Sequence, residues 1–218
     1  MGAQVLRIPL RSSQVLDYSK PVPEKRVSSV GHPMTRNAPV LTAEDLYTIP
    51  ENGFRYELVR GVLRTMAFHD AEHGVVSLNI GCHLMFYARQ HELGSTYAAG
   101  TGFHISSNPD SVLSPDVAFV AQDRVKTIID RRKFVPFAPD LAVEVLSPED
   151  NQNQAERRAD DWLSAGSRAV TIVDPSNETV RIYLSSKKSV ILNELDILEV
   201  PDIVPGWSIS VAEIFMSD

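Results

Sequence analysis

The sequence predicts a single α/β domain preceded by a tail, and three observations lead to this fold class. At 218 residues the chain is long enough for one domain with a sizeable core. Short apolar runs bounded by proline, at 116–120 and 140–146, are typical of strands in a covered sheet. Longer segments with apolar residues at helical spacing, 70–92 and 148–165, alternate with these runs. Strands that alternate with helices favour an α/β arrangement.

The composition is ordinary for a soluble globular protein, with 43% hydrophobic and 22% charged residues. The longest apolar run is too short to cross a bilayer, and no secretory signal is recognisable. We therefore expect a cytoplasmic setting and no membrane partner. The single cysteine, Cys82, excludes an internal disulfide and a cysteine-based zinc cluster.

Charge is unevenly distributed along the chain, whose net charge is −7. Residues 1–40 carry six basic and two acidic side chains, so the rest of the chain has a net charge of −11. Scattered proline and serine without any sustained period predict that residues 1–40 are a flexible basic N-terminal arm and that residues 41–218 are the domain. The arm is either an extension without chemistry or a segment that contacts DNA.

The first half of the domain predicts a helix, a hairpin and a long helix. Thr42, followed by acidic residues, is typical of a helix N-cap. The segments 54–59 and 62–66 are separated by a two-residue turn and predict a β-hairpin. His73 lies in the first turn of the helix expected over 70–92, where it is either a hydrogen-bonding residue or a ligand.

The second half predicts further strands and a closing helix. Short strands are expected at 95–99 and 103–106. The buried strand 169–173 is expected to pair with the alternating segment 180–184 across a turn. The chain ends in a turn and a short helix at 211–215.

Two carboxylates lie in predicted core strands, where apolar side chains are expected. Side chains alternate along 140–146, which puts Glu144 on one apolar face of a buried strand, where an unpaired carboxylate is costly. Asp116 begins the neighbouring predicted strand, and two such carboxylates can hold one Mg²⁺. In the alternative interpretation Asp116 caps the start of its strand and Glu144 pairs with an arginine.

Other motifs carry less information. The chain has no phosphate-binding GxxxxGK[ST] loop, no GxSxG nucleophile elbow and no HExxH metal motif. Its six histidines show no convincing ligand spacing. The basic cluster Arg131-Arg132-Lys133 is either a solvated turn or a patch that contacts phosphate.

An ordered series of motifs nevertheless resembles the Uma-two family, a bacterial group of restriction-like nucleases, from roughly Leu41 to Phe215. The motifs are Tyr56-Glu57-Leu58-Val59-x-Gly61, His73, Pro115-Asp116-Val117, Pro139-Asp140-Leu141-x-Val143-Glu144-Val145-Leu146-Ser147-Pro148, Ala165-Gly166, Val173-Asp174-Pro175 and Pro205-Gly206-Trp207.

The resemblance implies a restriction-endonuclease-like PD-(D/E)XK fold, in which helices flank a mixed central sheet. It implies that Glu57, Asp116 and Glu144 are metal ligands and catalytic residues for Mg²⁺ or Mn²⁺. The usual lysine position, two residues after the second acid, is Leu146 here. The family takes its lysine from the following helix, and Arg158 stands at that place.

Trp162 replaces the family's tyrosine in the same helix, so the chain departs from the pattern twice. Arginine keeps a positive charge but cannot act as a base. Arg157 and His73 are candidate accessory or substrate-contacting residues. The expected function is a Mg²⁺-dependent endonuclease acting on nucleic acid, expected to be DNA, with a homodimer suggested by analogy.

Two alternatives remain open. One is a catalytically impaired nuclease-fold protein that serves as a binding or regulatory module, which the replacement of lysine favours. The other is a metal-dependent hydrolase of a smaller phosphate ester, which the acidic body of the domain suits.

Overall fold

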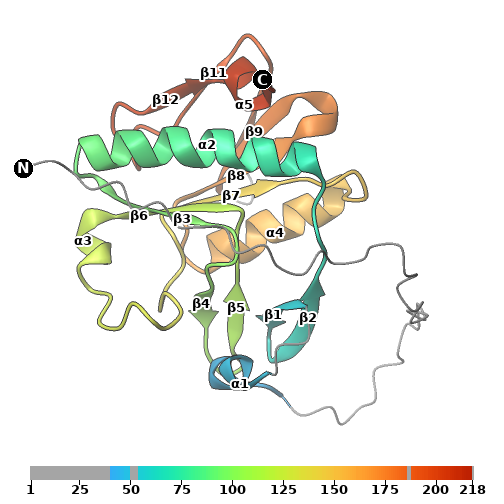
Figure 1. Cartoon of the computed structure of the whole chain (residues 1–218), viewed down its shortest axis with the longest axis vertical. Helices are drawn as coiled ribbons and strands as arrows, with labels where there is room; N and C mark the ends of the chain where they lie inside the picture. The colour runs from blue at the N-terminus through green and yellow to red at the C-terminus, as the bar shows by residue number, and fades with distance from the viewer. Residues whose placement is uncertain (1–39, 50–53, 186–187, 218) are drawn as a thin grey trace, which may run out of the picture. The chain divides into compact units, whose positions relative to one another are not determined.

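The computed structural model describes residues 40–49, 54–185 and 188–217, and a mixed six-stranded sheet lies at its centre (Figure 1). The strand order is β10-β9-β8-β7-β6-β3. Only β7 and β8 run parallel, because helix α4 connects them as a crossover; the other neighbours are antiparallel. The strands are β3 (Gly94–Ala98), β6 (Val117–Ala121), β7 (Leu141–Val145), β8 (Ala169–Asp174), β9 (Thr179–Ser185) and β10 (Lys188–Leu192).

Strand β7 is buried on both faces, as the sequence predicted. Leu141, Val143 and Val145 belong to the core beneath helix α2, whereas Ala142 belongs to the core beneath α4. Burying one side chain of this size contributes about 1.5–3 kcal/mol. Glu144 shares the α4 face with Ala142, so the only charged side chain within the strand faces one helix and not the other.

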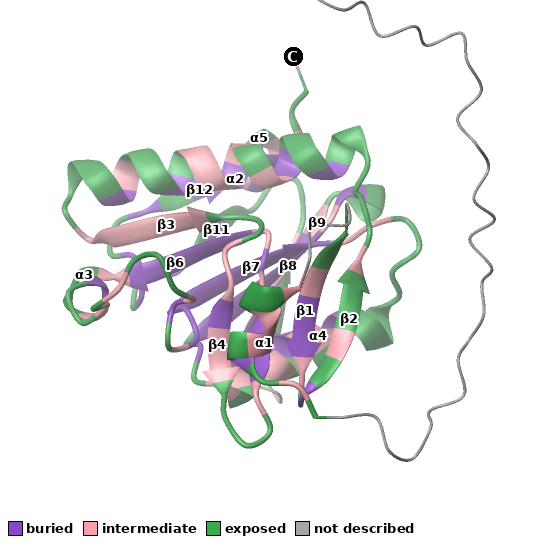
Figure 2. Cartoon of the chain, turned by 60° about the horizontal axis from the view of Figure 1, so that its bottom comes forward, coloured by how far each residue is buried: buried purple, intermediate pink, exposed green. Residues whose placement is uncertain are grey.

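Two long helices cover the sheet on opposite faces (Figure 1). Helix α2 (Ala71–Gln90) is capped by Asp70 and buries Val76, Ile80, Leu84 and Ala88. Helix α4 (Gln152–Ser164) begins at the cap Asn151 and buries Ala155, Ala159 and Trp162. Both helices match the predicted spacing, and Figure 2 shows the buried strands between them.

A glycine sets the distance between α2 and the sheet. A Cβ atom at Gly81 would lie 3.3 Å from Cγ2 of Val117, which is closer than ordinary van der Waals contact. The small residue therefore lets α2 approach the start of β6.

A second sheet of four strands, in the order β2-β1-β5-β4, lies beside the first. The predicted hairpin is confirmed, because β1 and β2 pair antiparallel through a turn in which Arg60 and Gly61 both have positive φ. The short strand β5 was not predicted. The elements are α1 (Ala43–Thr48), β1 (Arg55–Val59), β2 (Val62–Met66), β4 (Phe103–Ser106) and β5 (Ser111–Leu113).

The C-terminal elements complete the core on the α2 side. Helix α5 (Val211–Phe215) is confirmed, and the predicted turn before it carries Trp207 into the core. A two-stranded sheet of β11 (Ile197–Glu199) and β12 (Ser208–Ser210) was not predicted, nor was β10. A short helix, α3 (Gln122–Val125), and a 3₁₀ turn, Pro175–Asn177, complete the set.

The predicted boundary near residue 40 stays a prediction, because residues 1–39 lie outside the described part of the chain. The sequence also predicts a turn at Asn52-Gly53, before the hairpin, and these residues lie outside the described part as well. Within the described ranges, no helix combines the length and the hydropathy that a bilayer crossing requires.

Candidate active site

Asp116 lies where the two sheets meet. The segment 114–116 links β5 of the small sheet to β6 of the central sheet. The backbone N–H of Asp116 donates to the carbonyl of Val143 at 3.0 Å, and its Oδ2 accepts from the N–H of Val145 at 2.8 Å. These two bonds hold Asp116 beside β7, at the two residues that flank Glu144 in sequence.

Glu144 is held by two residues of α4 and is 3% exposed. Its Oε2 accepts from Nη2 and Nε of Arg158 at 2.7 and 3.1 Å, and its Oε1 accepts from Nε1 of Trp162 at 2.6 Å. Burial raises the pKa of Glu144 to about 7, although the positive charge of Arg158 works to lower it. The pairing of Glu144 with an arginine, left open by the sequence, is therefore present.

Glu57 extends from the middle of β1 and is buried. Its Oε1 accepts from the N–H of Ser114 at 2.9 Å, which ties it to the segment that carries Asp116. Burial raises the pKa of Glu57, and the charge of Arg158 opposes that shift. The pKa of Arg158 is itself raised, first by Glu144 and also by Glu57 and Asp116. One guanidinium therefore acts on all three predicted acids.

The three acids nevertheless do not form the tightest set of ligand atoms. Among the described residues, one group of three or more His, Cys, Asp or Glu side chains has its ligand atoms within 4.8 Å of one another, namely His69, His73 and Asp116. The assignment of Glu57 and Glu144 as metal ligands stays a prediction.

His73 is buried in the first turn of α2, with Nε2 3.3 Å from Oδ2 of Asp116. Burial works to lower the pKa of His73, but the hydrogen bond and charge of Asp116 outweigh it, so the pKa is raised. His69 stacks on His73 with ring centroids 3.8 Å apart, and burial lowers the pKa of His69.

His69 was missed by the sequence reasoning, which found no convincing ligand spacing among the histidines. The available signal was its position four residues before His73, on the other side of the helix cap Asp70. Ser147, at the end of the Glu-Val-Leu-Ser-Pro motif, lies 3.0 Å from Nδ1 of His69 and was missed as well.

The remaining predicted positions, Leu146, Arg157 and Arg158, differ in their surroundings. Leu146, at the usual lysine position, packs against the apolar core on the α4 side. Arg157 is exposed, whereas its neighbour Arg158 reaches Glu144. Arg158 is therefore the cation that α4 supplies to the site.

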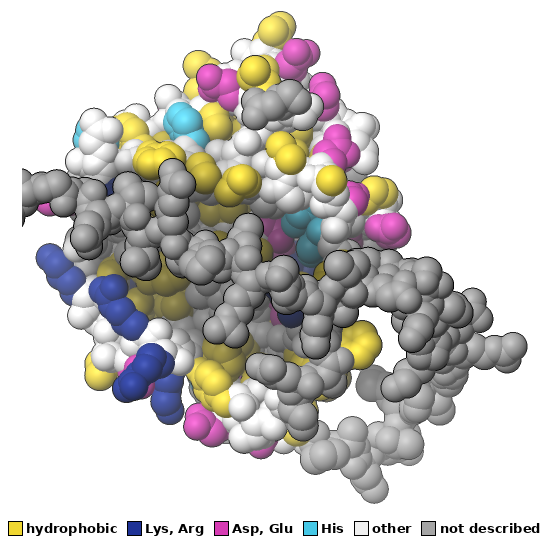
Figure 3. All heavy atoms as spheres, viewed as in Figure 1, with side chains coloured by type: hydrophobic (Ala, Val, Ile, Leu, Met, Phe, Trp, Pro, Cys, Tyr) yellow, Lys and Arg dark blue, Asp and Glu magenta, His cyan; other side chains and the backbone are white. Residues whose placement is uncertain are grey.

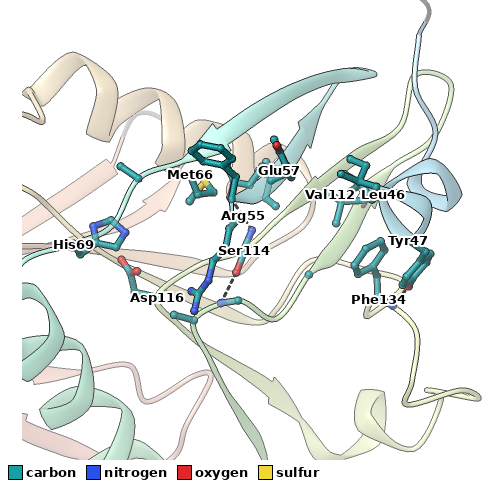
Figure 4. A pocket seen from close by; sticks show the side chains of 18 residues that line it. Leu46, Tyr47, Arg55, Glu57, Met66, His69, Val112, Ser114, Asp116 and Phe134 are labelled. Carbon is teal, nitrogen blue, oxygen red and sulfur yellow. Dashed lines mark hydrogen bonds between the residues drawn. The ribbon is translucent and has the colours of Figure 1, made fainter. Parts of the chain in front are cut away.

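A cavity of about 560 Å³ opens beside these residues (Figure 4). Asp116 and His69 lie at one end of it, and the stacked rings of Tyr47 and Phe134 lie at the other, with centroids 4.2 Å apart. A second groove of about 440 Å³ runs between α2 and β3 and also reaches Asp116. Asp116 is thus accessible from two sides.

No curated protein matches this chain. A crystal structure of a "putative nuclease" from Anabaena variabilis matches with a TM-score of 0.68 and 16% sequence identity, over 80% of this chain and 97% of that one. This similarity confirms the restriction-endonuclease-like fold. The Uma2 (Uma-two) family model, described as "Putative restriction endonuclease", matches residues 43–212. The chain therefore belongs to the Uma2 family.

Proposed function

We propose that this chain is a metal-dependent nuclease that hydrolyses phosphodiester bonds of nucleic acid. The observation that supports this most strongly is the arrangement of three carboxylates from separate elements: Glu144 accepts from Arg158, Asp116 accepts from the N–H of Val145, and Glu57 accepts from the N–H of Ser114. A core built for stability alone has no need of three carboxylates around one guanidinium, because each buried charge is costly. Membership of the family supports the same reaction class.

The donor set fits a divalent cation at Asp116. Carboxylate oxygens are preferred ligands of Mg²⁺ and Mn²⁺, and no hydrogen bond to Oδ1 of Asp116 is found within the described ranges. Glu57 and Glu144 are the predicted further carboxylates. A bound cation supplies a more acidic water and stabilises negative charge on the phosphate.

Arg158 is proposed to bind the substrate phosphate and to balance its negative charge. Its side chain is 37% exposed, and the bonds to Glu144 use Nε and Nη2, so the guanidinium has further N–H donors. Such donors bind phosphate in a fixed geometry. Because arginine does not release a proton, deprotonation of the attacking water falls to a neighbouring carboxylate or imidazole.

Two surface features support nucleic acid as the substrate. Arg131, Arg132 and Lys133 are exposed after α3, where Figure 3 shows basic side chains gathered on one side of an otherwise acidic domain. The stacked rings of Tyr47 and Phe134 line the cavity that leads to Asp116, and aromatic rings are suited to stacking on bases.

The second candidate function is a binding or regulatory module that has lost catalysis. The observation in its favour is that both oxygens of Glu144 accept hydrogen bonds from Arg158 and Trp162. A carboxylate engaged in this way has less capacity to bind a cation.

One experiment separates these functions. Labelled single- and double-stranded DNA and RNA are incubated with the protein and Mg²⁺ or Mn²⁺, alongside Glu144→Gln and the control Glu149→Gln, which alters an exposed carboxylate just beyond the same strand. We expect cleavage by the wild type and the control and at least a hundredfold loss in Glu144→Gln. Tight binding of intact nucleic acid would favour the module. Metal binding without cleavage or binding of nucleic acid would favour a hydrolase that acts on a smaller phosphate ester.

A further inference from the structure

The cavity beside Asp116 has two ends of different chemistry. Asp116 lies at one end, and at the other lie the apolar and aromatic side chains of Leu46, Tyr47, Val112 and Phe134 (Figure 4). A nucleotide has the same polarity, because the faces of its base are flat and largely apolar whereas its phosphate is charged. The cavity volume of about 560 Å³ lies within the range of roughly 300–1,000 Å³ that is typical of sites for small ligands. The cavity therefore suits one nucleotide and not a section of double helix.

The aromatic pair at the apolar end is packed into the fold on the Phe134 side and exposed on the Tyr47 side. A Cβ atom at Gly102 would lie 2.5 Å from Cδ1 of Phe134, so the ring of Phe134 occupies the space beside that glycine. Tyr47 stacks on Phe134 at an interplanar angle of 16°, and its hydroxyl accepts a hydrogen bond from the N–H of Phe134. Tyr47 is 43% exposed and lines the cavity, so a further flat ring can extend the stack.

Stacking on a side chain requires a base that is not paired within a duplex. The faces of a base in a double helix are covered by its neighbours, so proteins that stack on a base take single strands or extrude a nucleotide. Stacking on aromatic side chains is general among proteins that bind single strands, and it tolerates every base. The exposed ring of Tyr47 therefore favours an unpaired nucleotide.

Arg55 supplies a cation to the same cavity. The residue is exposed at the start of β1 and lines the cavity beside Asp116. A Cβ atom at Gly100 would lie 3.6 Å from Nη1 of Arg55, and the N–H of Gly100 donates to Oγ of Ser114 at 2.8 Å. The guanidinium therefore lies near the segment that carries Asp116. Arg55 forms no salt bridge with any residue that the structure describes, so its charge is available to a phosphate.

We propose that this cavity binds one unpaired nucleotide of a single-stranded nucleic acid, with the base stacked on Tyr47 and a phosphate bound by Arg55. The inference rests on the proposed function and deepens it, because it names the class of nucleic acid that the same site accepts. Arg55 binds and orients the strand, and Arg158 remains the cation beside Glu144.

Fluorescence anisotropy in the presence of a chelator tests the preference on the full chain, because binding is then measured without cleavage. The probes are labelled DNA and RNA strands of about 15 nucleotides, each free and annealed to its complement. We expect at least one of the two single strands to bind at least tenfold more tightly than its duplex. A smaller preference for both DNA and RNA, or no binding of either single strand at high micromolar protein, would overturn the proposal.

Variants of Tyr47 test the stacking contact. Tyr47→Leu should weaken binding of the single strand at least fivefold because the base loses its aromatic partner, whereas Tyr47→Phe keeps the ring and should change the affinity less than twofold. The matched control is Phe86→Leu, which removes an exposed ring from α2 and should also change the affinity less than twofold. A loss below fivefold in Tyr47→Leu, or an equal loss in Tyr47→Phe, would overturn the stacking contact.

Arg55→Gln tests the phosphate contact through the salt dependence of binding. Loss of one phosphate contact should reduce the slope of log affinity against log salt concentration by about 0.7 for a single strand. The control Arg89→Gln, exposed in the last turn of α2, should leave the slope unchanged. An unchanged slope in Arg55→Gln would overturn the role of Arg55.

The outcomes for this inference and for the nuclease function are separate. Cleavage by the wild-type protein with Mg²⁺, without any preference for single strands, would overturn the inference and leave the nuclease function intact. Preferential binding of a single strand that stays intact with Mg²⁺ and Mn²⁺ would support the nucleotide site and overturn the nuclease function.

Discussion

Glu144 and Asp116 are carboxylates on adjoining strands, and their surroundings are opposite. Glu144 accepts three hydrogen bonds from Arg158 and Trp162, so its charge is balanced by the chain itself. Asp116 accepts one backbone hydrogen bond, and its Oδ2 lies 3.3 Å from Nε2 of His73. The first carboxylate is paired with an arginine of the chain, whereas the second is the one that we propose binds a cation.

The two residues that depart from the pattern implied by the family resemblance both lie beside Glu144. Arg158 takes the place expected for lysine and Trp162 the place expected for tyrosine, and both donate to Glu144. The two replacements therefore act together on one carboxylate. Asp116 lies within the same electrostatic neighbourhood, yet neither replacement donates a hydrogen bond to it.

The largest expected effect is on stability, from Arg158→Met. Removing the guanidinium leaves Glu144 buried without its charged partner, and breaking such a pair costs about 3 kcal/mol after allowance for the partial exposure of Arg158. Urea unfolding at neutral pH measures the change. Arg157→Met, on the exposed side of the same helix, is the control and should change the free energy of unfolding by less than about 0.5 kcal/mol. Equal losses in both variants would contradict the account.

Trp162→Phe tests the second donor to Glu144. The matched control is Trp207→Phe, because Trp207 is equally buried and its Nε1 donates to an uncharged acceptor, Nδ1 of His83, at 2.9 Å. Both variants lose similar packing, so the hydrogen bond to the carboxylate should make Trp162→Phe costlier by about 1 kcal/mol. The same unfolding experiment applies. A smaller loss for Trp162→Phe would mean that this bond contributes little.

Arg158→Lys introduces the lysine that the family resemblance implies and should raise the rate of nucleic-acid cleavage about tenfold, which corresponds to about 1.4 kcal/mol of barrier. Lysine keeps the charge, and its proton can be released when burial lowers its pKa. Single-turnover cleavage rates with Mn²⁺ measure the effect. An unchanged rate would show that arginine is not the limiting replacement.

Asp116→Asn should change stability by less than about 1 kcal/mol in metal-free protein. The amide oxygen can still accept from the N–H of Val145, and the amide nitrogen can donate to Nε2 of His73. Thermal unfolding with a chelator present measures this. A loss comparable to that of Arg158→Met would mean that the charge of Asp116 is balanced within the chain, and the contrast with Glu144 would disappear.

Much of the fold could be predicted because its main elements carry a regular period. The alternation along β7 predicted which side chains share a face, and the spacing of Val76, Ile80 and Leu84 predicted the helix itself. Strands β5, β11 and β12 were missed because three residues are too few to establish a period, and β10 because its side chains are mostly exposed.

The site was less predictable, because side-chain partners depend on tertiary geometry. The positions of Glu57, Asp116 and Arg158 followed from motifs in a known order. The stacking of His69 on His73 did not, since nothing local indicates that a residue before a helix cap meets the start of a distant strand. The choice of Arg158 over Arg157 followed from the buried face of α4.

The most direct test of the contrast between the two carboxylates is anomalous diffraction from crystals of the protein grown with Mn²⁺. The account predicts a single strong anomalous peak within coordination distance of Asp116, with the pair between Glu144 and Arg158 intact. A peak away from Asp116, or a peak at Asp116 that displaces Arg158 from Glu144, would contradict the account.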